Sequence, residues 1–235
     1  MEDLTGLDAG VYTVTVVDDS GCVATGQYEL ELERPYQPSL CLLTVDTSFV
    51  YNEVVWQKDA TQSIDGFNVY RETQVQGQFE LVANRPYALE SRFMDNAASP
   101  TDRSWRYYIT TYDACGTESY PGFIHKTIHT VSTTSNGTDF DVFWDDYEGI
   151  SYSSVDLWRH DDTNGWLNIG SYAPGINTTP DTPPVLTGLD YMVSFNLTTT
   201  CTSTKATDYN SSRSNRTTSS FDPGGTSVNI EDNEI

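Results

Sequence analysis

Acidic side chains are the first residues of this sequence whose pattern could bind a ligand. Asp145 and Asp146 are adjacent, and Asp139 and Asp141 lie just before them. Calcium prefers clustered carboxylate and carbonyl oxygens, so these four residues are candidate calcium ligands. Their spacing is not that of the Asp-x-Asp-x-Asp-Gly calcium loop, and Asp at turns commonly bonds its own backbone. We expect no cofactor, with calcium as the alternative.

Residues that could perform catalysis form no recognisable pattern. His125 and His129 would share a strand face about 13 Å apart, at roughly 3.3 Å per residue, whereas histidine ligands lie about 2 Å from a metal ion. The sequence contains no Cys-x-x-Cys pair and no Gly-x-Ser-x-Gly nucleophile motif. Neither a metalloenzyme nor a hydrolase of that type is indicated, and we expect the chain not to be an enzyme.

Outward-facing aromatic residues are better candidates for binding. Because side chains alternate along a strand, Phe67 and Val69 would point inward and Tyr70 outward. The same alternation places further aromatic rings on the surface, where they can stack on sugars or contact a protein. The candidate ligand or partner surface consists of Tyr70, Tyr108, Tyr112 and Trp158. Trp166 and Tyr172 are secondary candidates.

These residues lie in a sequence that repeats itself. The spacing from Trp56 to Arg71 is fifteen residues, and so is the spacing from Trp144 to Arg159. An apolar segment, a tyrosine-led segment and a cysteine follow each arginine. Tandem copies of a small β unit indicate a modular protein, and we expect each tryptophan in the core of its copy.

Composition narrows the classes of partner. The chain has 235 residues, with 34 acidic and 12 basic side chains and a formal net charge of −22. Such a charge repels nucleic acid, and no segment reaches the roughly 20 consecutive apolar residues of a membrane-spanning helix. We therefore expect neither nucleic-acid binding nor membrane insertion. The length suits two β-sandwiches of about 100 residues each, with flanking segments.

Alternating apolar residues and turn signals predict an all-β chain. The predicted parts are a hairpin in 1–33, a proline-containing linker in 34–39, sandwiches in 40–128 and 129–213, and a tail in 214–235. The last strands of the second sandwich are expected near 183–187, 190–198 and 204–210. The tail has almost nothing to bury and is expected to be flexible.

The N-terminal segment resembles a known repeat. Residues 2–22, which include Leu4-Thr5-Gly6-Leu7 and Gly10-Val11-Tyr12-Thr13, are similar to the second half of a SprB-type repeat. Such repeats occur in large surface adhesins of gliding Bacteroidota. The resemblance covers about the first 30 residues, and it implies that the first half of the repeat belongs to a longer protein from which this chain is cut.

The two repeated units resemble fibronectin type III-like, immunoglobulin-like sandwiches. Six segments are similar to the region that precedes the sorting domain of Bacteroidota secreted proteins: 41–46, 54–58, 70–72, 113–116, 125–129 and 210–216. Such proteins resemble type IX secretion cargo. The resemblance implies an extracellular or cell-surface location, and the type IX machinery as a partner through a C-terminal sorting domain that this sequence lacks.

The cysteines are interpreted through the same resemblance. In a fibronectin-like sandwich the start of the first strand and the loop after the sixth lie at one pole, which implies a Cys41–Cys115 disulfide. Cys22 would pair within the missing half-repeat, and Cys201 has no evident mate. Free buried thiols are the alternative for these last two cysteines.

Three functions are compatible with these observations. The favoured one is a non-catalytic stalk or adhesin segment of a large secreted bacterial surface protein, with a protein or glycan partner at the cell surface. The second is an accessory glycan-binding region of a secreted enzyme. The third is a subunit of an extracellular filament that assembles by strand pairing through the N-terminal hairpin.

Overall fold

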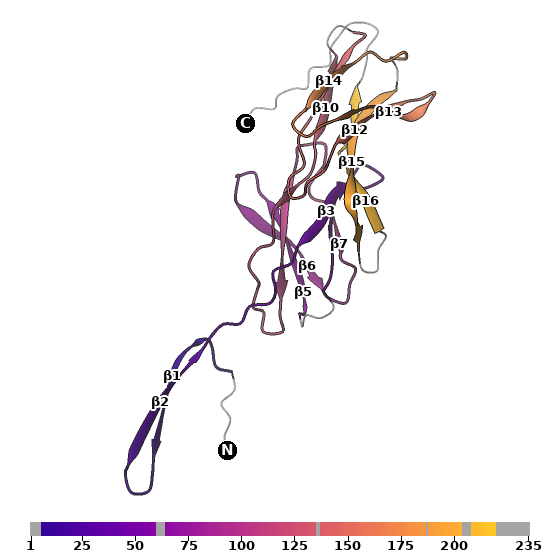
Figure 1. The fold of residues 1–235 in the computed structure, drawn as a ribbon. Coiled ribbons are helices and arrows are strands. Elements are labelled where there is room, and N and C mark those ends of the chain that lie inside the picture. The colour runs from indigo at the N-terminus through magenta and orange to yellow at the C-terminus, as the bar shows by residue number, and fades with distance from the viewer. Residues whose placement is uncertain (1–5, 60–63, 135–136, 187, 204–207, 220–235) are drawn as a thin grey trace.

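The computed structural model describes residues 6–59, 64–134, 137–186, 188–203 and 208–219 (Figure 1). All regular secondary structure in these residues is β-strand. No helix in this part of the chain is long and apolar enough to cross a membrane. The all-β prediction is therefore confirmed, because the alternating segments of the sequence form strands and not amphipathic helices.

A hairpin projects from the body of the protein at its N-terminal end (Figure 1). It consists of β1 (Gly10–Val17) and β2 (Val23–Leu30), paired antiparallel with Val17 opposite Val23. Asp18 closes the turn by accepting hydrogen bonds from the backbone N–H groups of Ser20 and Cys22. The valines of both strands are exposed, so the hairpin has no core of its own.

The first sandwich has three strands packed on four. One sheet has the order β3 (Leu40–Val45), β4 (Asn52–Trp56), β7 (Arg92–Asp95). The other has the order β6 (Phe79–Pro86), β5 (Gly66–Glu72), β8 (Arg106–Tyr112), β9 (His125–Lys126). All pairings are antiparallel.

The second sandwich repeats this arrangement. Its smaller sheet has the order β10 (Thr130–Thr134), β11 (Phe140–Trp144), β14 (Thr178–Asp181). Its larger sheet has the order β13 (Gly165–Tyr172), β12 (Val155–Asp161), β15 (Leu189–Thr202), β16 (Asp208–Arg213), and β17 (Thr217–Ser219) also pairs with β15. The strand order in both units is that of tandem immunoglobulin- or fibronectin III-like sandwiches.

Alternation along the strands builds the cores as expected. Trp56 is fully buried, and Trp144 is 4% exposed. Phe67 and Val69 of β5 are buried, whereas Tyr70 is partly exposed. The buried residues of the two sandwiches form one continuous cluster and not two separate cores. The two units are therefore packed together through their apolar interiors.

The C-terminal strands differ from the prediction. The strand expected near 183–187 lies at Thr178–Asp181, and the expected strand 190–198 extends to Thr202. A flexible tail from residue 214 was the wrong expectation for residues 214–219, because Ser214 and Asn215 are buried. The Asn215 side chain accepts a hydrogen bond from the Thr130 backbone N–H at 2.7 Å and donates one to the Thr130 carbonyl at 2.8 Å. Polar bonding, not apolar burial, orders this segment; residues 220–235 lie outside the described residues.

Candidate functional site

Outside the cores, the main feature of the structure is the junction between the two sandwiches. The 14-residue strand β15 and its neighbour β16 continue past the second sandwich and lie beside the first (Figure 1). The Ser212 hydroxyl donates to the Leu43 carbonyl at 2.7 Å. The Arg213 backbone N–H donates to the Thr44 hydroxyl oxygen at 3.1 Å. Strand β3 of the first sandwich is therefore bonded along its side to β16 of the second.

A disulfide joins Cys41 at the start of β3 to Cys201 near the end of β15, with a Cα–Cα distance of 5.8 Å. The predicted Cys41–Cys115 pairing is wrong, since Cys115 is an exposed free cysteine in the turn after β8. The reason is the length of β15. The expected strand ended at residue 198, so the sequence did not indicate that Cys201 would lie beside the first sandwich. Cys22 is also free and exposed.

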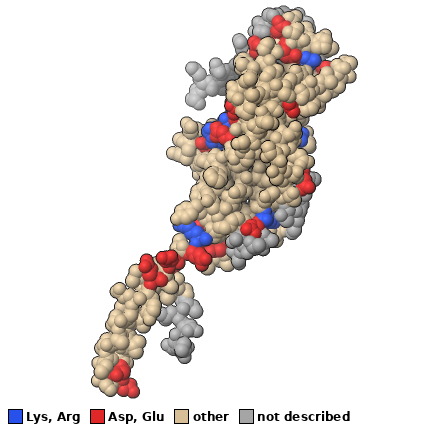
Figure 2. Space-filling view, in the orientation of Figure 1, with Lys and Arg blue, Asp and Glu red and all other residues tan. Residues whose placement is uncertain are grey.

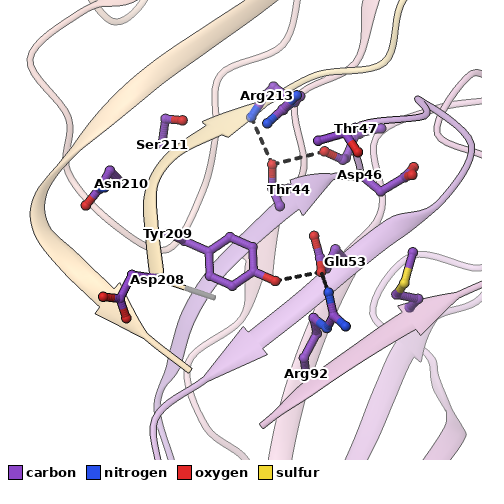
Figure 3. A pocket seen from close by; sticks show the side chains of 12 residues that line it. Thr44, Asp46, Thr47, Glu53, Arg92, Asp208, Tyr209, Asn210, Ser211 and Arg213 are labelled. Carbon is purple, nitrogen blue, oxygen red and sulfur yellow. Dashed lines mark hydrogen bonds and ion pairs between the residues drawn. The ribbon is translucent and has the colours of Figure 1, made fainter. Parts of the chain in front are cut away.

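A buried carboxylate of the first sandwich bonds across the same junction. Glu53 on β4 accepts a hydrogen bond from the Tyr209 hydroxyl at 2.7 Å, and it forms an ion pair with Arg92 at 3.0 Å (Figure 3). Burial and the bond to Glu53 raise the pKa of Tyr209 to about 12. These side chains line a polar pocket of about 360 Å³ between β3, β4, β7 and β16. Residues from both sandwiches form the wall of this pocket.

Tyr147 of the second sandwich also contacts Leu43 of β3. Its hydroxyl oxygen accepts a hydrogen bond from the Leu43 backbone N–H at 2.8 Å and lies 2.9 Å from His125 Nδ1. The oxygen that accepts from Leu43 keeps its own proton, which it can donate to Nδ1 when His125 is neutral and protonated on its other nitrogen. Burial raises the pKa of Tyr147, and its ring packs edge-on against Phe195 at 5.0 Å.

His125 is enclosed at this contact. Burial lowers its pKa to about 4. A Cβ on Gly149, where φ is +113°, would lie 2.3 Å from the His125 ring, so only glycine fits there. In the tautomer whose Nδ1 accepts from Tyr147, protonation would also turn Nδ1 into a donor that faces this hydroxyl. The junction is therefore built around a neutral imidazole.

We expect acidification to destabilise the protein through His125. Its pKa is about 4 in the folded chain and about 6.5 in an unfolded chain. The contribution of neutral His125 to the free energy of unfolding is complete above pH 6.5 and decreases as the pH falls. By pH 4 the free energy of unfolding is lower by about 3 kcal/mol. Urea unfolding measured from pH 7.5 to 4 would show this loss. In His125→Gln, the free energy of unfolding should decrease less between pH 6.5 and pH 4 than it does in the parent. An unchanged decrease contradicts the assignment to His125.

An ion cluster closes the edge next to Tyr147. Glu148 pairs with Arg106 at 2.8 Å and with Lys126 at 3.2 Å, and the Lys126 backbone N–H donates to the Glu148 carbonyl at 3.1 Å. The hydrogen bond from Arg106 is the main cause of a lowered pKa at Glu148. The sandwiches are therefore joined by apolar packing, backbone pairing, ion pairs and a disulfide together.

The repeated arginines form one clamp in each sandwich. Arg71 on β5 binds both oxygens of Asp95 on β7 at 3.0 and 2.8 Å, and the Tyr107 hydroxyl donates to the same carboxylate at 3.0 Å. In the second sandwich, Arg159, Asp181 and Tyr191 make the same three bonds at 2.8, 2.9 and 2.8 Å. Each clamp joins the larger sheet to the smaller one. The fifteen-residue spacing therefore marks a core tryptophan and a sheet-bridging arginine.

The predicted aromatic surface is divided between the two sandwiches. Tyr70 and Tyr108 stack at 4.8 Å on the first, and the Tyr70 hydroxyl donates to Glu118 at 3.0 Å. Burial is the largest cause that raises the pKa of Tyr70 to about 12, and the hydrogen bond to Glu118 is the second. Tyr112, on the same sheet, donates to Asn84 at 3.2 Å. Trp158 belongs to the second sandwich and lies beside Trp166, the secondary candidate, with which it lines a cavity.

The four candidate calcium ligands do not converge. Asp139 accepts a hydrogen bond from Thr182 at 2.7 Å, and Asp146 accepts from the Tyr152 hydroxyl at 3.0 Å. Asp141 lies within β11, and the Asp145 backbone N–H donates to the His129 carbonyl. In the described part of the chain, no three His, Cys, Asp or Glu side chains form a group that could hold a metal ion.

Comparisons with known proteins found only distant matches to the fold. No protein-family model and no curated protein matches the chain. Among solved structures, the FN1–FN3 domains of chicken CNTN1 match with 9% identity and a TM-score of 0.34, over 77% of this chain and 68% of that chain. The central fibronectin-III array of RIM-binding protein matches with 13% identity and a TM-score of 0.31, over 68% of this chain and 62% of that chain. A two-domain fibronectin type III segment of chicken tenascin matches with 13% identity and a TM-score of 0.27, over 78% of this chain and 96% of that chain.

Proposed function

We propose that this chain is a non-catalytic stalk segment of a large secreted surface protein, in which two sandwiches act as one rigid spacer. The observation that carries the proposal is the Cys41–Cys201 disulfide between the sandwiches. Independent modules in a flexible array would not share a core cluster, a carboxylate such as Glu53 and a covalent bond. A spacer that holds a distal binding region away from the cell benefits from this kind of junction.

The position of the disulfide has a mechanical consequence. Its two cysteines are 160 residues apart in the sequence. When the ends of the chain are pulled, tension passes from the segment before Cys41 through the sulfur atoms to the segment after Cys201. The sandwich residues between them are excluded from the extending chain, even if their tertiary structure is lost. A stalk of this kind would keep its length under load.

Force spectroscopy on single molecules tests the proposal. With handles at residues 1 and 235, the oxidised chain should release about 560 Å less contour length than the Cys201→Ser chain, from 160 residues at roughly 3.5 Å each. Cys115→Ser serves as the matched control and should behave like the parent. Equal contour lengths for parent and Cys201→Ser chains contradict a spacer shielded by this bond.

We further propose export by the type IX system and display at the cell surface, with a protein or glycan as partner there. The support is the similarity of residues 2–22 to a SprB-type repeat and of segments such as 113–116 and 125–129 to type IX cargo. Antibody labelling of intact cells tests this. Labelling should require a working type IX machinery, and intracellular retention in cells that have it contradicts the proposal.

A further inference from the structure

Arg213 differs from the other cations of this acidic chain. Each other Lys or Arg that the structure describes contacts a carboxylate or a backbone carbonyl. Figure 2 shows basic side chains beside acidic ones on one face of the molecule. The Arg213 guanidinium has no hydrogen bond or ion pair with any described residue, although its backbone N–H is bonded to Thr44. Arg213 is partly buried, and a guanidinium with no partner among the described residues is suited to bind an anion.

The surroundings of Arg213 form a small aromatic cavity. Together with Trp158, Trp166 and Met192, it lines a volume of about 260 Å³ on the outer face of the second sandwich. The Trp158 indole N–H donates to the Ser194 hydroxyl at 2.9 Å, which fixes the orientation of that ring. The volume lies just below the roughly 300–1,000 Å³ typical of small-molecule sites, so it suits a single ring.

The first sandwich contributes to this neighbourhood through the loop between β3 and β4. Phe49 in that loop lies 5.9 Å from the Trp166 ring, and the Arg216 guanidinium lies 5.7 Å above Phe49. Phe49 has a φ of +61°, and it alone among the described non-glycine residues has a positive φ. A bulky residue held in this unfavourable conformation requires support from its surroundings. The junction therefore positions an aromatic side chain beside the cavity.

We propose that this cavity binds a carboxylate-bearing sugar, such as a hexuronic acid unit of a glycan. The two indole rings offer apolar faces to a pyranose ring, and Arg213 can bind a carboxylate through two parallel hydrogen bonds. The hydroxyls of Ser194 and Ser211 line the same cavity and can bond sugar hydroxyls. An extended acidic peptide fits less well, because peptides bind along open strand edges or grooves and not in a ring-sized hollow.

Titration with methyl glucuronide, followed by NMR of the indole N–H signals, tests this inference. The parent chain should bind the glucuronide at least tenfold more tightly than methyl glucoside. Arg213→Met should weaken glucuronide binding at least tenfold, whereas Arg213→Lys should retain part of it because the charge remains. Arg85→Met, which removes a cation from the first sandwich, should bind as the parent does.

Trp166→Ala separates the aromatic contribution and should weaken binding of both sugars. Signal dispersion in each spectrum establishes that the variant is folded, and Arg213→Lys keeps the test valid if Arg213→Met does not fold. The inference is overturned if the parent does not bind the glucuronide, if Arg213→Met binds it unchanged, or if an aspartate-rich peptide binds and the sugar does not. None of these outcomes bears on the contour length that tests the stalk.

Discussion

Replacing Cys201 with serine is expected to lower the free energy of unfolding by about 4 kcal/mol, since a cross-link over 160 residues strongly restricts the unfolded chain. Denaturant unfolding of oxidised parent and variant measures the difference. The variant should also show greater relative motion of the sandwiches in small-angle X-ray scattering, because only non-covalent contacts then hold β16 against β3. Reduction of the parent should produce the same two changes.

Cys115→Ser is the matched control, because Cys115 is exposed and free. It should leave both stability and scattering unchanged. The structure also predicts a single disulfide-linked peptide pair containing Cys41 and Cys201 in a digest of the oxidised protein. Recovery of a Cys41–Cys115 peptide, with a loss of stability in Cys115→Ser, would instead support the pairing implied by the family resemblance.

The second large effect is expected at the clamp of the first sandwich. Asp95→Ala should destabilise the protein by about 3–5 kcal/mol, because it leaves the Arg71 guanidinium without its buried carboxylate and the Tyr107 hydroxyl without an acceptor. Asp95 is 2% exposed, so water cannot readily replace the lost bonds. Urea unfolding monitored by tryptophan fluorescence is a suitable measurement.

Glu80→Gln provides the control within the same network. Glu80 pairs with the other terminal nitrogen of Arg71 at 2.6 Å, but its side chain is 50% exposed. An exposed ion pair contributes about 1 kcal/mol or less, so this variant should be nearly neutral. The double variant Arg71→Met/Asp95→Leu should recover much of the stability, because both charges are removed. Equal losses for Asp95→Ala and Glu80→Gln would contradict the clamp.

The architecture of the protein could be predicted from local sequence. Alternation of apolar residues in strands such as 66–72 determines which face is buried, because successive side chains point to opposite sides of a sheet. The fifteen-residue spacing from Trp56 to Arg71 is a local constraint of the same kind, and its recurrence identified two copies of one unit. Trp56 and Trp144 were therefore correctly placed in the cores.

The junction could not be predicted in this way, because it depends on how far strands of one sandwich continue along the other. Only the tertiary structure decided that β15 carries Cys201 to Cys41, that Asn215 bonds the backbone of Thr130, and that the Arg213 guanidinium lies beside Trp158 with no partner among the described residues. These residues lie tens to more than a hundred positions apart in the sequence, and most of their side chains are polar or sulfur-containing. Periodicity records burial within a strand, but it contains no information about which distant strand supplies a partner.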